Sequence, residues 1–151
     1  MPEGRVRRAR RGDIAGLLAL ESHFPTDRLS RANFRHLLTR GHADLLVFEQ
    51  DARVVGDAII LYRRGTHTAR LYSLVTNPAH RGQGIATRLI AAAERAARHR
   101  RCNRICLEAR PGNRAAIGLY RALGYYAAGR RAGFYEDGRD ALVLEKHLAS
   151  R

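Results

Sequence analysis

A glycine-rich turn is the stretch of this sequence best suited to binding a small anion. It comprises Arg81, Gly82, Gln83, Gly84, Ile85 and Ala86. The first backbone amides of a helix have no partner within the helix and lie at the positive end of its dipole. Glycines let a phosphate come close to the backbone, and the Arg81 guanidinium adds a positive charge. The turn therefore predicts a pyrophosphate site, with a solvated helix N-terminus as the alternative.

The elements on either side of this turn follow from hydropathy and from the residues that end strands and helices. Residues 68–76 are predicted to form a strand, which Pro78 ends because proline cannot donate a hydrogen bond to a sheet. After the turn, apolar residues recur at helical spacing as far as about Arg101. A strand and a helix therefore flank the turn.

The first half of the chain is predicted to contain a strand, two helices and a β-hairpin. The helices begin at Gly12-Asp13 and at Ser30, and they end at Pro25 and at Gly41. The strands are expected over 5–9, 45–49 and 54–62, the last two joined by a turn over 50–53. With residues 68–76, the last two strands form an antiparallel meander.

Glu108 lies on an alternating stretch in the second half of the chain. Apolar Leu107 and Ala109 flank it, which predicts a strand that turns Glu108 away from the core helix. A helix then begins at Asn113 and carries Tyr120 on its inner side.

Two further strands complete the chain, over 125–128 and 140–146, with a loop over 129–138 between them. The predicted order is β-α-α-β-β-β-α-β-α-β-β. It indicates an α/β fold with a mixed sheet and helices on both faces. At 151 residues, the whole chain, 1–151, is expected to be one domain.

The composition excludes several classes of protein. Hydrophobic residues make up 45% and charged residues 28%, which is ordinary for a globular domain. No apolar run has the length of a membrane span or of a secretory signal, so a cytoplasmic location is expected, with no membrane partner. Cys102 and Cys106 are expected to be reduced thiols, and no His or Cys spacing indicates a metal site.

The net charge of +14 comes from 28 basic and 14 acidic residues. Such a surface attracts polyanions, including anionic cofactors, acidic proteins and, weakly, nucleic acid. Only Lys146 is a lysine, so a compositional bias toward arginine is an alternative explanation.

The glycine-rich turn resembles the coenzyme A motif of the GNAT superfamily of acetyltransferases. That motif is Arg or Gln, two residues, Gly, one residue, then Gly or Ala, and Arg81, Gly84 and Ala86 match it. The predicted element order also resembles that of GNAT domains. The resemblance implies acetyl-coenzyme A as the donor and residues 81–86 as the site of its pyrophosphate. It also implies that the pantetheine arm pairs with Leu74, Val75 and Thr76.

The second half of the chain is similar to the RimI-type protein N-terminal acetyltransferases. The matching stretches lie within 108–125 and 134–141. The resemblance implies Glu108 as the general base, Tyr120 as the general acid and Asn113 as a further cofactor-binding residue.

Two loops are expected to select the acceptor, one around Leu29 and the other around Tyr135. The resemblance implies that an aromatic residue in the second loop lines a peptide slot. The first loop, 24–30, resembles the RimI type only loosely, because it lacks the aromatic residue often found there.

The chemistry explains why these residue types are needed. An amine at neutral pH is mostly a cation and must lose a proton before it attacks a thioester, and the Glu108 carboxylate can accept that proton. The thiolate of coenzyme A then leaves, and the Tyr120 phenol can donate a proton to it. The expected reaction is direct transfer without a metal or a covalent enzyme intermediate.

The sequence therefore predicts an N-acetyltransferase that acts on the N-terminal α-amine of a protein or peptide, with a ribosomal protein as the acceptor that the RimI-type resemblance implies. Two alternatives stay open: acetylation of a small-molecule amine, or a basic RNA- or ribosome-binding module with a vestigial acetyl-coenzyme A site. Edge strands could pair with a second copy, so both a monomer and a homodimer are compatible with the sequence.

Overall fold

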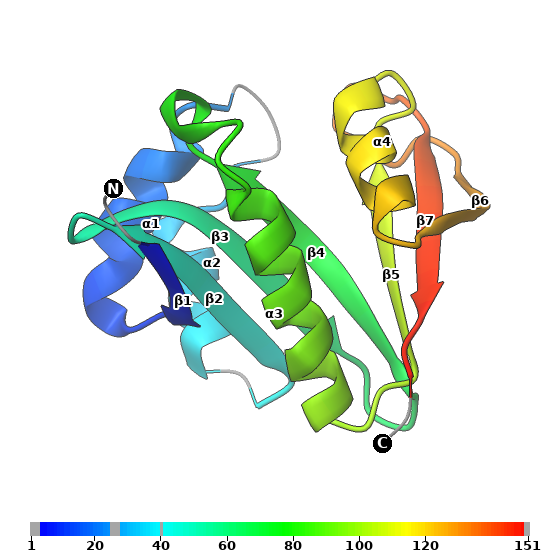
Figure 1. The fold of residues 1–151 in the computed structure, drawn as a ribbon, viewed down its shortest axis with the longest axis horizontal. Coiled ribbons are helices and arrows are strands. Elements are labelled where there is room, and N and C mark those ends of the chain that lie inside the picture. Colours follow the sequence, from blue (N-terminus) through cyan, green and yellow to red (C-terminus); the bar gives the residue numbers. More distant parts are fainter. Residues whose placement is uncertain (1–3, 25–27, 40, 150–151) are drawn as a thin grey trace.

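A computed structural model describes residues 4–24, 28–39 and 41–149. They form a seven-stranded mixed sheet with helices on both faces (Figure 1). The strands are β1 (Gly4–Arg8), β2 (Ala43–Gln50), β3 (Arg53–Tyr62), β4 (Thr68–Thr76), β5 (Arg104–Ala109), β6 (Tyr126–Arg131) and β7 (Ala141–His147). The α-helices are α1 (Ile14–Glu21), α2 (Arg31–Thr39), α3 (Ile85–His99) and α4 (Arg114–Ala122), and short 3₁₀ helices cover Arg11–Asp13 and Pro78–His80.

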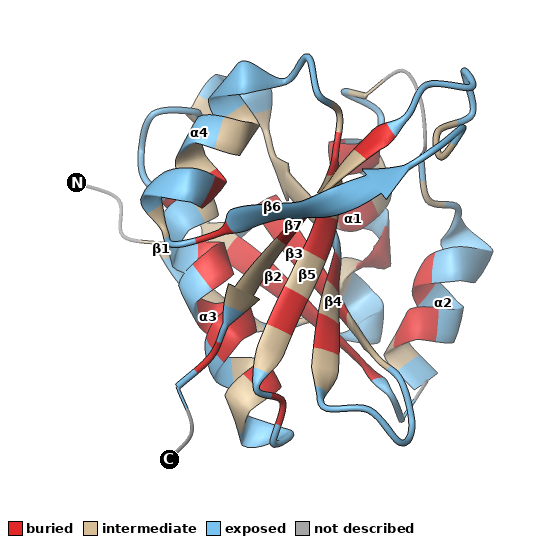
Figure 2. Cartoon of the chain, turned by 90° about the vertical axis from the view of Figure 1, so that its right-hand side faces the viewer, coloured by how far each residue is buried: buried red, intermediate tan, exposed pale blue. Residues whose placement is uncertain are grey.

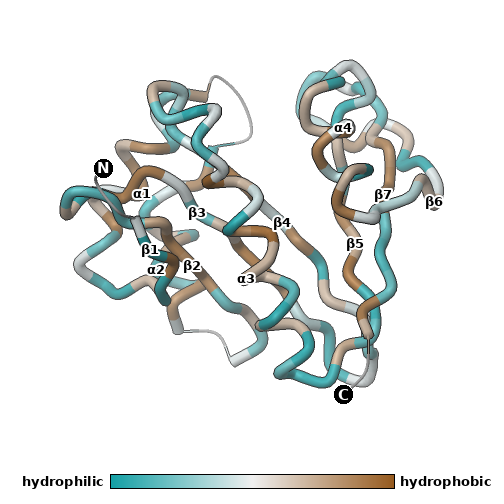
Figure 3. Tube along the Cα trace, in the orientation of Figure 1, coloured by the Kyte–Doolittle hydropathy of each residue, from teal (hydrophilic) through white to brown (hydrophobic). Residues whose placement is uncertain are grey.

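Two hydrophobic cores lie on opposite faces of this sheet. Helices α3 and α4 pack on one face, over residues such as Ile60 and Leu107. Helices α1 and α2 pack on the other face, over Val47 and Ile59. Figure 2 shows the buried residues along the central strands, and Figure 3 shows hydrophobic residues concentrated in elements such as β5 and α1. No helix in the described part of the chain is long and apolar enough to cross a membrane.

The sheet order is β1-β2-β3-β4-β5-β7-β6, and its only parallel neighbours among the described strands are β4 and β5. These two strands pair only at Thr68–Arg70 with Arg104–Cys106. Beyond those residues they diverge, and Figure 1 shows the ribbons separating toward the end of the sheet that carries the α1–α2 loop. The sheet therefore splits between β4 and β5.

The outer strands of the sheet are β1 and β6. All six residues of β6 are exposed, and Arg130 and Arg131 lie among them. At the opposite edge, β1 carries Arg5, Arg7 and Arg8. Both outer strands of the sheet therefore carry arginines.

The predicted order of elements is confirmed, with most boundaries within two residues of those predicted and two larger shifts. The first helix ends at Glu21, whereas the expected stop at Pro25 lies outside the described residues. Strand β6 extends to Arg131, so residues 129–131, predicted as loop, are strand. Its register slips between Ala127 and Gly129, which means that Gly129 marks a bulge and not the end of the strand.

Candidate active site

The glycine-rich turn has the backbone geometry of an anion site. Gly82 and Gly84 have φ angles of 80° and 77°, in the left-handed region that favours glycine. Gly84 is the N-cap of α3, and within the described residues the amides of Gly82, Gln83 and Gly84 donate to no protein acceptor. Arg81 is exposed beside them and forms no ion pair with any described carboxylate. The turn thus presents free donors and one unpaired cation.

The end of β4 leads directly into this turn. On one side, Thr76 and Val75 pair with Gly56 and Asp57 of β3. On the other side, β4 has no strand partner among the described residues beyond Arg70, because β5 has diverged. The register of β4 also slips at Tyr72, which is therefore a bulge. Backbone groups of Leu74, Val75 and Thr76 on that free side are available to an extended ligand.

Glu108 is enclosed and ion-paired, although the sequence suggested only a polar strand face. Its side chain is 4% exposed, and Arg70 Nε donates to Oε1 over 3.0 Å. Arg131 Nε lies 3.4 Å from Oε2, but that oxygen is buried and accepts no hydrogen bond. One Glu108 oxygen therefore has no hydrogen-bond donor, although two arginines lie beside the carboxylate.

The arginines around Glu108 also hold the β6–β7 loop against the sheet. Arg70 lies over the rings of Tyr72 and Phe134, at 5.4 and 5.8 Å from their centroids. Arg110 lies 4.0 Å from the centroid of the Tyr135 ring and forms an ion pair of 2.8 Å with Asp137 in the same loop. Sequence reasoning missed Arg70 and its part in this arrangement.

Tyr120 lies on the other face of β5, within the core formed with α3 and α4. It is 7% exposed, and its ring meets that of Tyr125 edge to face at 5.4 Å. Burial, with a smaller contribution from the Tyr135 phenol, raises the pKa of Tyr120 above its ordinary value. The phenol is therefore protonated at neutral pH and close enough to Tyr135 to interact with it electrostatically.

Two other predicted site residues have structural contacts. Asn113 caps α4, its side chain accepting a hydrogen bond of 3.2 Å from the Ala116 amide. Leu29 packs against the core under α1 and α2, and its amide donates to Glu21 Oε1 over 2.7 Å. Glu21, which sequence reasoning missed, therefore anchors the α1–α2 loop.

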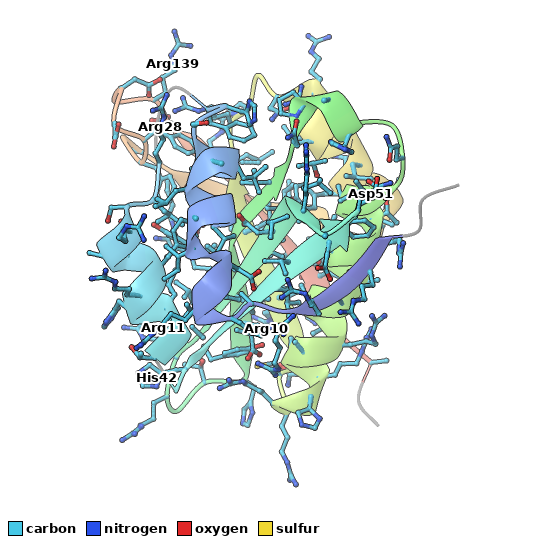
Figure 4. The ribbon with its side chains drawn as sticks, turned by 90° about the vertical axis from the view of Figure 1, so that its left-hand side faces the viewer. Arg10, Arg11, Arg28, His42, Asp51 and Arg139 are labelled. Atoms are coloured by element: carbon cyan, nitrogen blue, oxygen red, sulfur yellow. The ribbon has the colours of Figure 1, made fainter. Side chains whose placement is uncertain are left out.

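The predicted site residues gather around the split between β4 and β5. The α1–α2 and β6–β7 loops lie at the end of the sheet where the split opens, and Figure 4 shows Arg28 and Arg139, one from each loop, at the same end of the molecule. Glu108 and Tyr120 do not contact each other, because they lie on opposite faces of β5. Among the described residues no group of three or more His, Cys, Asp or Glu side chains has the arrangement of a metal site.

Comparisons with known proteins agree with this geometry. Residues 13–125 match the model of the acetyltransferase (GNAT) family. The chain is 30% identical over 141 residues to a putative [ribosomal protein bS18]-alanine N-acetyltransferase of Bacillus subtilis, covering 92% of both proteins. Its fold is similar to that of the ribosomal-protein-S18-alanine N-acetyltransferase from Escherichia coli, with a TM-score of 0.86, 22% identity, and coverage of 99% of this chain and 96% of the other. The PaiA N-acetyltransferase from Thermoplasma acidophilum, solved in complex with coenzyme A, has a TM-score of 0.81 at 15% identity, over 96% and 99% of the two chains.

Proposed function

This chain belongs to the acetyltransferase (GNAT) family, and from that premise we propose that it transfers acetyl from acetyl-coenzyme A to the N-terminal α-amine of a protein. The observation that carries the proposal is the split between β4 and β5. The free side of β4, the glycine-rich turn, Glu108 and Tyr120 all border it. The Bacillus subtilis relative is named for the alanine of ribosomal protein bS18, which makes a ribosomal protein the leading acceptor.

The donor site follows from the backbone groups that have no protein partner. The amides at Gly82 to Gly84 and the start of α3, with Arg81, suit the two phosphates of coenzyme A. The residues Leu74, Val75 and Thr76 suit the amide groups of the pantetheine arm, because their free backbone side can pair as a strand does. Acetyl-coenzyme A, when bound, supplies a thioester carbonyl that an amine can attack. Asn113, as the cap of α4 beyond the split, is a further proposed contact.

The reacting groups approach from the two faces of the split. Glu108 faces away from the core of α3 and α4 and is proposed to accept the proton of the acceptor ammonium through Oε2, the oxygen without a hydrogen bond. Tyr120 lies on the opposite face and is proposed to donate its phenolic proton to the leaving sulfur. Arg70 holds the Glu108 carboxylate in one orientation and is proposed as a positioning residue.

The acceptor is proposed to lie between the α1–α2 and β6–β7 loops. Leu29 and Tyr135 belong to these loops, and both are held by contacts to neighbouring elements. A ribosomal acceptor implies that the reaction takes place in the cytoplasm. We also propose that the chain, 1–151, acts as one domain.

A peptide panel tests this function. Thiol release from acetyl-coenzyme A is measured with peptides that differ in their first residues, including an N-terminal alanine, and with small amines as a second arm. We expect turnover with peptides, a loss of about 100-fold or more in Tyr120→Phe, and a loss of about tenfold to 100-fold in Glu108→Gln.

The matched control is Tyr126→Phe. Tyr126 is an exposed tyrosine of β6 whose hydroxyl donates to Glu145, away from the split, so its rate should be unchanged. Turnover of small amines alone would assign the enzyme to another acceptor class, and no turnover with any amine would refute the proposal.

A further inference from the structure

Buried carboxylates among the described residues are paired with cations, except for one pair of acids. The 28 basic side chains outnumber the 14 acidic ones, so positive partners are in excess. The paired acids are Asp44 with Arg8 and Arg100, Glu94 with Lys146, and Glu108 with Arg70. Asp57 and Glu21 are buried too, but neither forms an ion pair with any described residue. The exception therefore does not reflect a shortage of cations.

Asp57 is enclosed without a polar partner. It is 1% exposed, and neither of its carboxylate oxygens has a hydrogen bond. Its cross-strand neighbours, Val47 and Val75, are apolar. Burial, and to a lesser degree the charge of Glu21, raises the pKa of Asp57 well above its ordinary value. An ionised carboxylate is unstable in such surroundings unless a cation joins it.

Helix α1 brings Glu21 to Asp57. Gly16 of α1 lies against Val54 of β3, where a Cβ on the glycine would be 3.4 Å from Val54 Cβ. From that contact, the five helical residues to Glu21 and the three strand residues to Asp57 span about 8 and 10 Å. The charge of Glu21 contributes to the raised pKa of Asp57, which is consistent with this proximity, and burial raises the pKa of Glu21 as well.

The acid pair lies next to the elements proposed to hold the substrates. Asp57 pairs across the sheet with Val75, whose free backbone side borders the split. Glu21 holds the α1–α2 loop through the Leu29 amide. Asp57 also belongs to the face of the sheet that carries α1, away from α3 and the glycine-rich turn. The pair is thus on the acceptor side of β4.

We propose that Asp57 and Glu21 form a binding site for the ammonium group of the acceptor. The inference rests on the proposed function, which brings a primary amine to this face, and it assigns recognition of the amine's charge to a pair distinct from Glu108. Because no described cation is ion-paired with either carboxylate, the proposal has the pair hold one proton in the free protein. When the ammonium binds, that proton leaves to solvent and the carboxylate becomes the counter-ion of the amine, so charge and protons balance.

Calorimetry of the wild-type protein gives the first test. An acceptor peptide is titrated in two buffers of different ionisation enthalpy at pH 7, and the same peptide already acetylated at its α-amine serves as the matched ligand control. We expect net proton release with the free amine, after correction for the amine's own ionisation, and none with the acetylated peptide. Equal proton exchange with both peptides would overturn the inference, whatever the behaviour of any variant.

Kinetics of Asp57→Asn give the second test, with Asp44→Asn as the matched control at a buried aspartate that has three polar partners. We expect Asp57→Asn to raise the KM for the peptide about tenfold or more and to leave the KM for acetyl-coenzyme A unchanged. Asp44→Asn should leave both KM values unchanged. A peptide KM within twofold of wild type in Asp57→Asn would contradict the assignment.

Failure of the inference and failure of the proposed function give different results. Peptide turnover with an unaffected Asp57→Asn refutes only the ammonium site. If wild type acetylates no peptide, propylamine is the probe: binding with proton release that Asp57→Asn abolishes supports the ammonium site without the proposed acceptor. Propylamine binding that is the same in both proteins, or absent from both, refutes it.

Discussion

Asp44 and Asp57 are equally buried, each 1% exposed, yet they have opposite surroundings. Asp44 faces α3 and accepts hydrogen bonds from Arg8, Arg100 and the Tyr62 hydroxyl. Asp57 faces α1 and accepts none. Burial alone therefore does not tell what a buried acid does. A buried carboxylate that accepts hydrogen bonds connects elements of the fold. One without hydrogen bonds destabilises the folded protein, and a ligand that supplies a partner can remove that destabilisation.

The pKa shifts follow the same division. For Asp44, burial opposes ionisation, but the hydrogen bonds from Tyr62, Arg8 and Arg100 outweigh it and lower the pKa. For Asp57, no hydrogen bond offsets burial, and the pKa is raised. Asp44 therefore stabilises the fold above its unfolded pKa and loses that contribution as pH falls through its folded pKa. The stabilising state of Asp57 is the protonated one, present below its unfolded pKa and lost as pH rises toward its folded pKa.

The largest effect on stability is expected from Asp44→Asn. The amide nitrogen of asparagine is a donor and would face the donors that now bind the carboxylate, so we expect a loss of about 2–4 kcal/mol in the free energy of unfolding. Urea denaturation at pH 7 measures it. The control is Asp51→Asn, at an exposed hairpin position where φ is 52° and asparagine is well tolerated (Figure 4). A loss no larger than in that control would remove the contrast between the two buried acids.

A smaller effect of opposite sign is expected from Asp57→Asn. Asparagine cannot ionise, so it avoids the cost that Asp57 incurs as pH rises, and we expect a gain of roughly 1–3 kcal/mol at pH 7. The gain should shrink as pH falls toward about 4, near the ordinary pKa of an aspartate. Thermal unfolding at pH 7 and pH 4.5 tests this. A gain that is independent of pH would show that Asp57 is ionised throughout.

Tyr62→Phe removes only one of the hydrogen-bond donors to Asp44 and so tests the contrast more finely. The Tyr62 hydroxyl donates to Asp44 Oδ2 over 2.7 Å, and both arginines remain after the change. We expect a loss of about 1 kcal/mol in the free energy of unfolding, measured by urea denaturation. An effect as large as that of Asp44→Asn would mean that the hydroxyl, and not the arginines, satisfies the carboxylate.

The smallest effect is expected from Arg8→Ala. The Arg8 side chain is 66% exposed, so solvent screens its ion pair with Asp44, and Arg100 remains in place. The expected loss is below about 0.5 kcal/mol. Denaturation at low and high salt measures it, and a loss above that of Tyr62→Phe would contradict this ranking.

Most of the fold could be predicted from the sequence because residues close by in the chain mark where its helices and strands begin and end. The strand Thr68–Thr76 was predicted with both boundaries correct, since Pro78 follows it closely. The hairpin turn was also predicted, and positive φ angles at Asp51 and Ala52 confirm a tight turn there. The end of β6 was predicted wrongly at Gly129, because glycine marks bulges as well as strand ends and only the register with β7 distinguishes the two.

Less of the candidate site could be predicted from the sequence, because its contacts join residues that are far apart in the chain. Glu108 could be assigned to a strand, but its partner Arg70 lies on β4, which pairs with β5 only briefly. The bulge at Tyr72 depends on the pairing with β3. Asp57 did leave a signal, a lone acid within an apolar strand, but its lack of a partner becomes evident only when the sheet and α1 are assembled.

The arginines on the two outer strands have a consequence for how copies of the protein coexist. Open sheet edges expose unpaired backbone groups that act as templates for fibril growth, and charged side chains on such edges act as gatekeepers against it. Here both outer strands carry exposed arginines, such as Arg5 of β1 and Arg130 of β6, and these side chains disfavour edge-to-edge pairing of two chains. Part of the arginine surplus thus protects the protein against aggregation. Every newly synthesised copy is exposed to that risk before it meets any substrate.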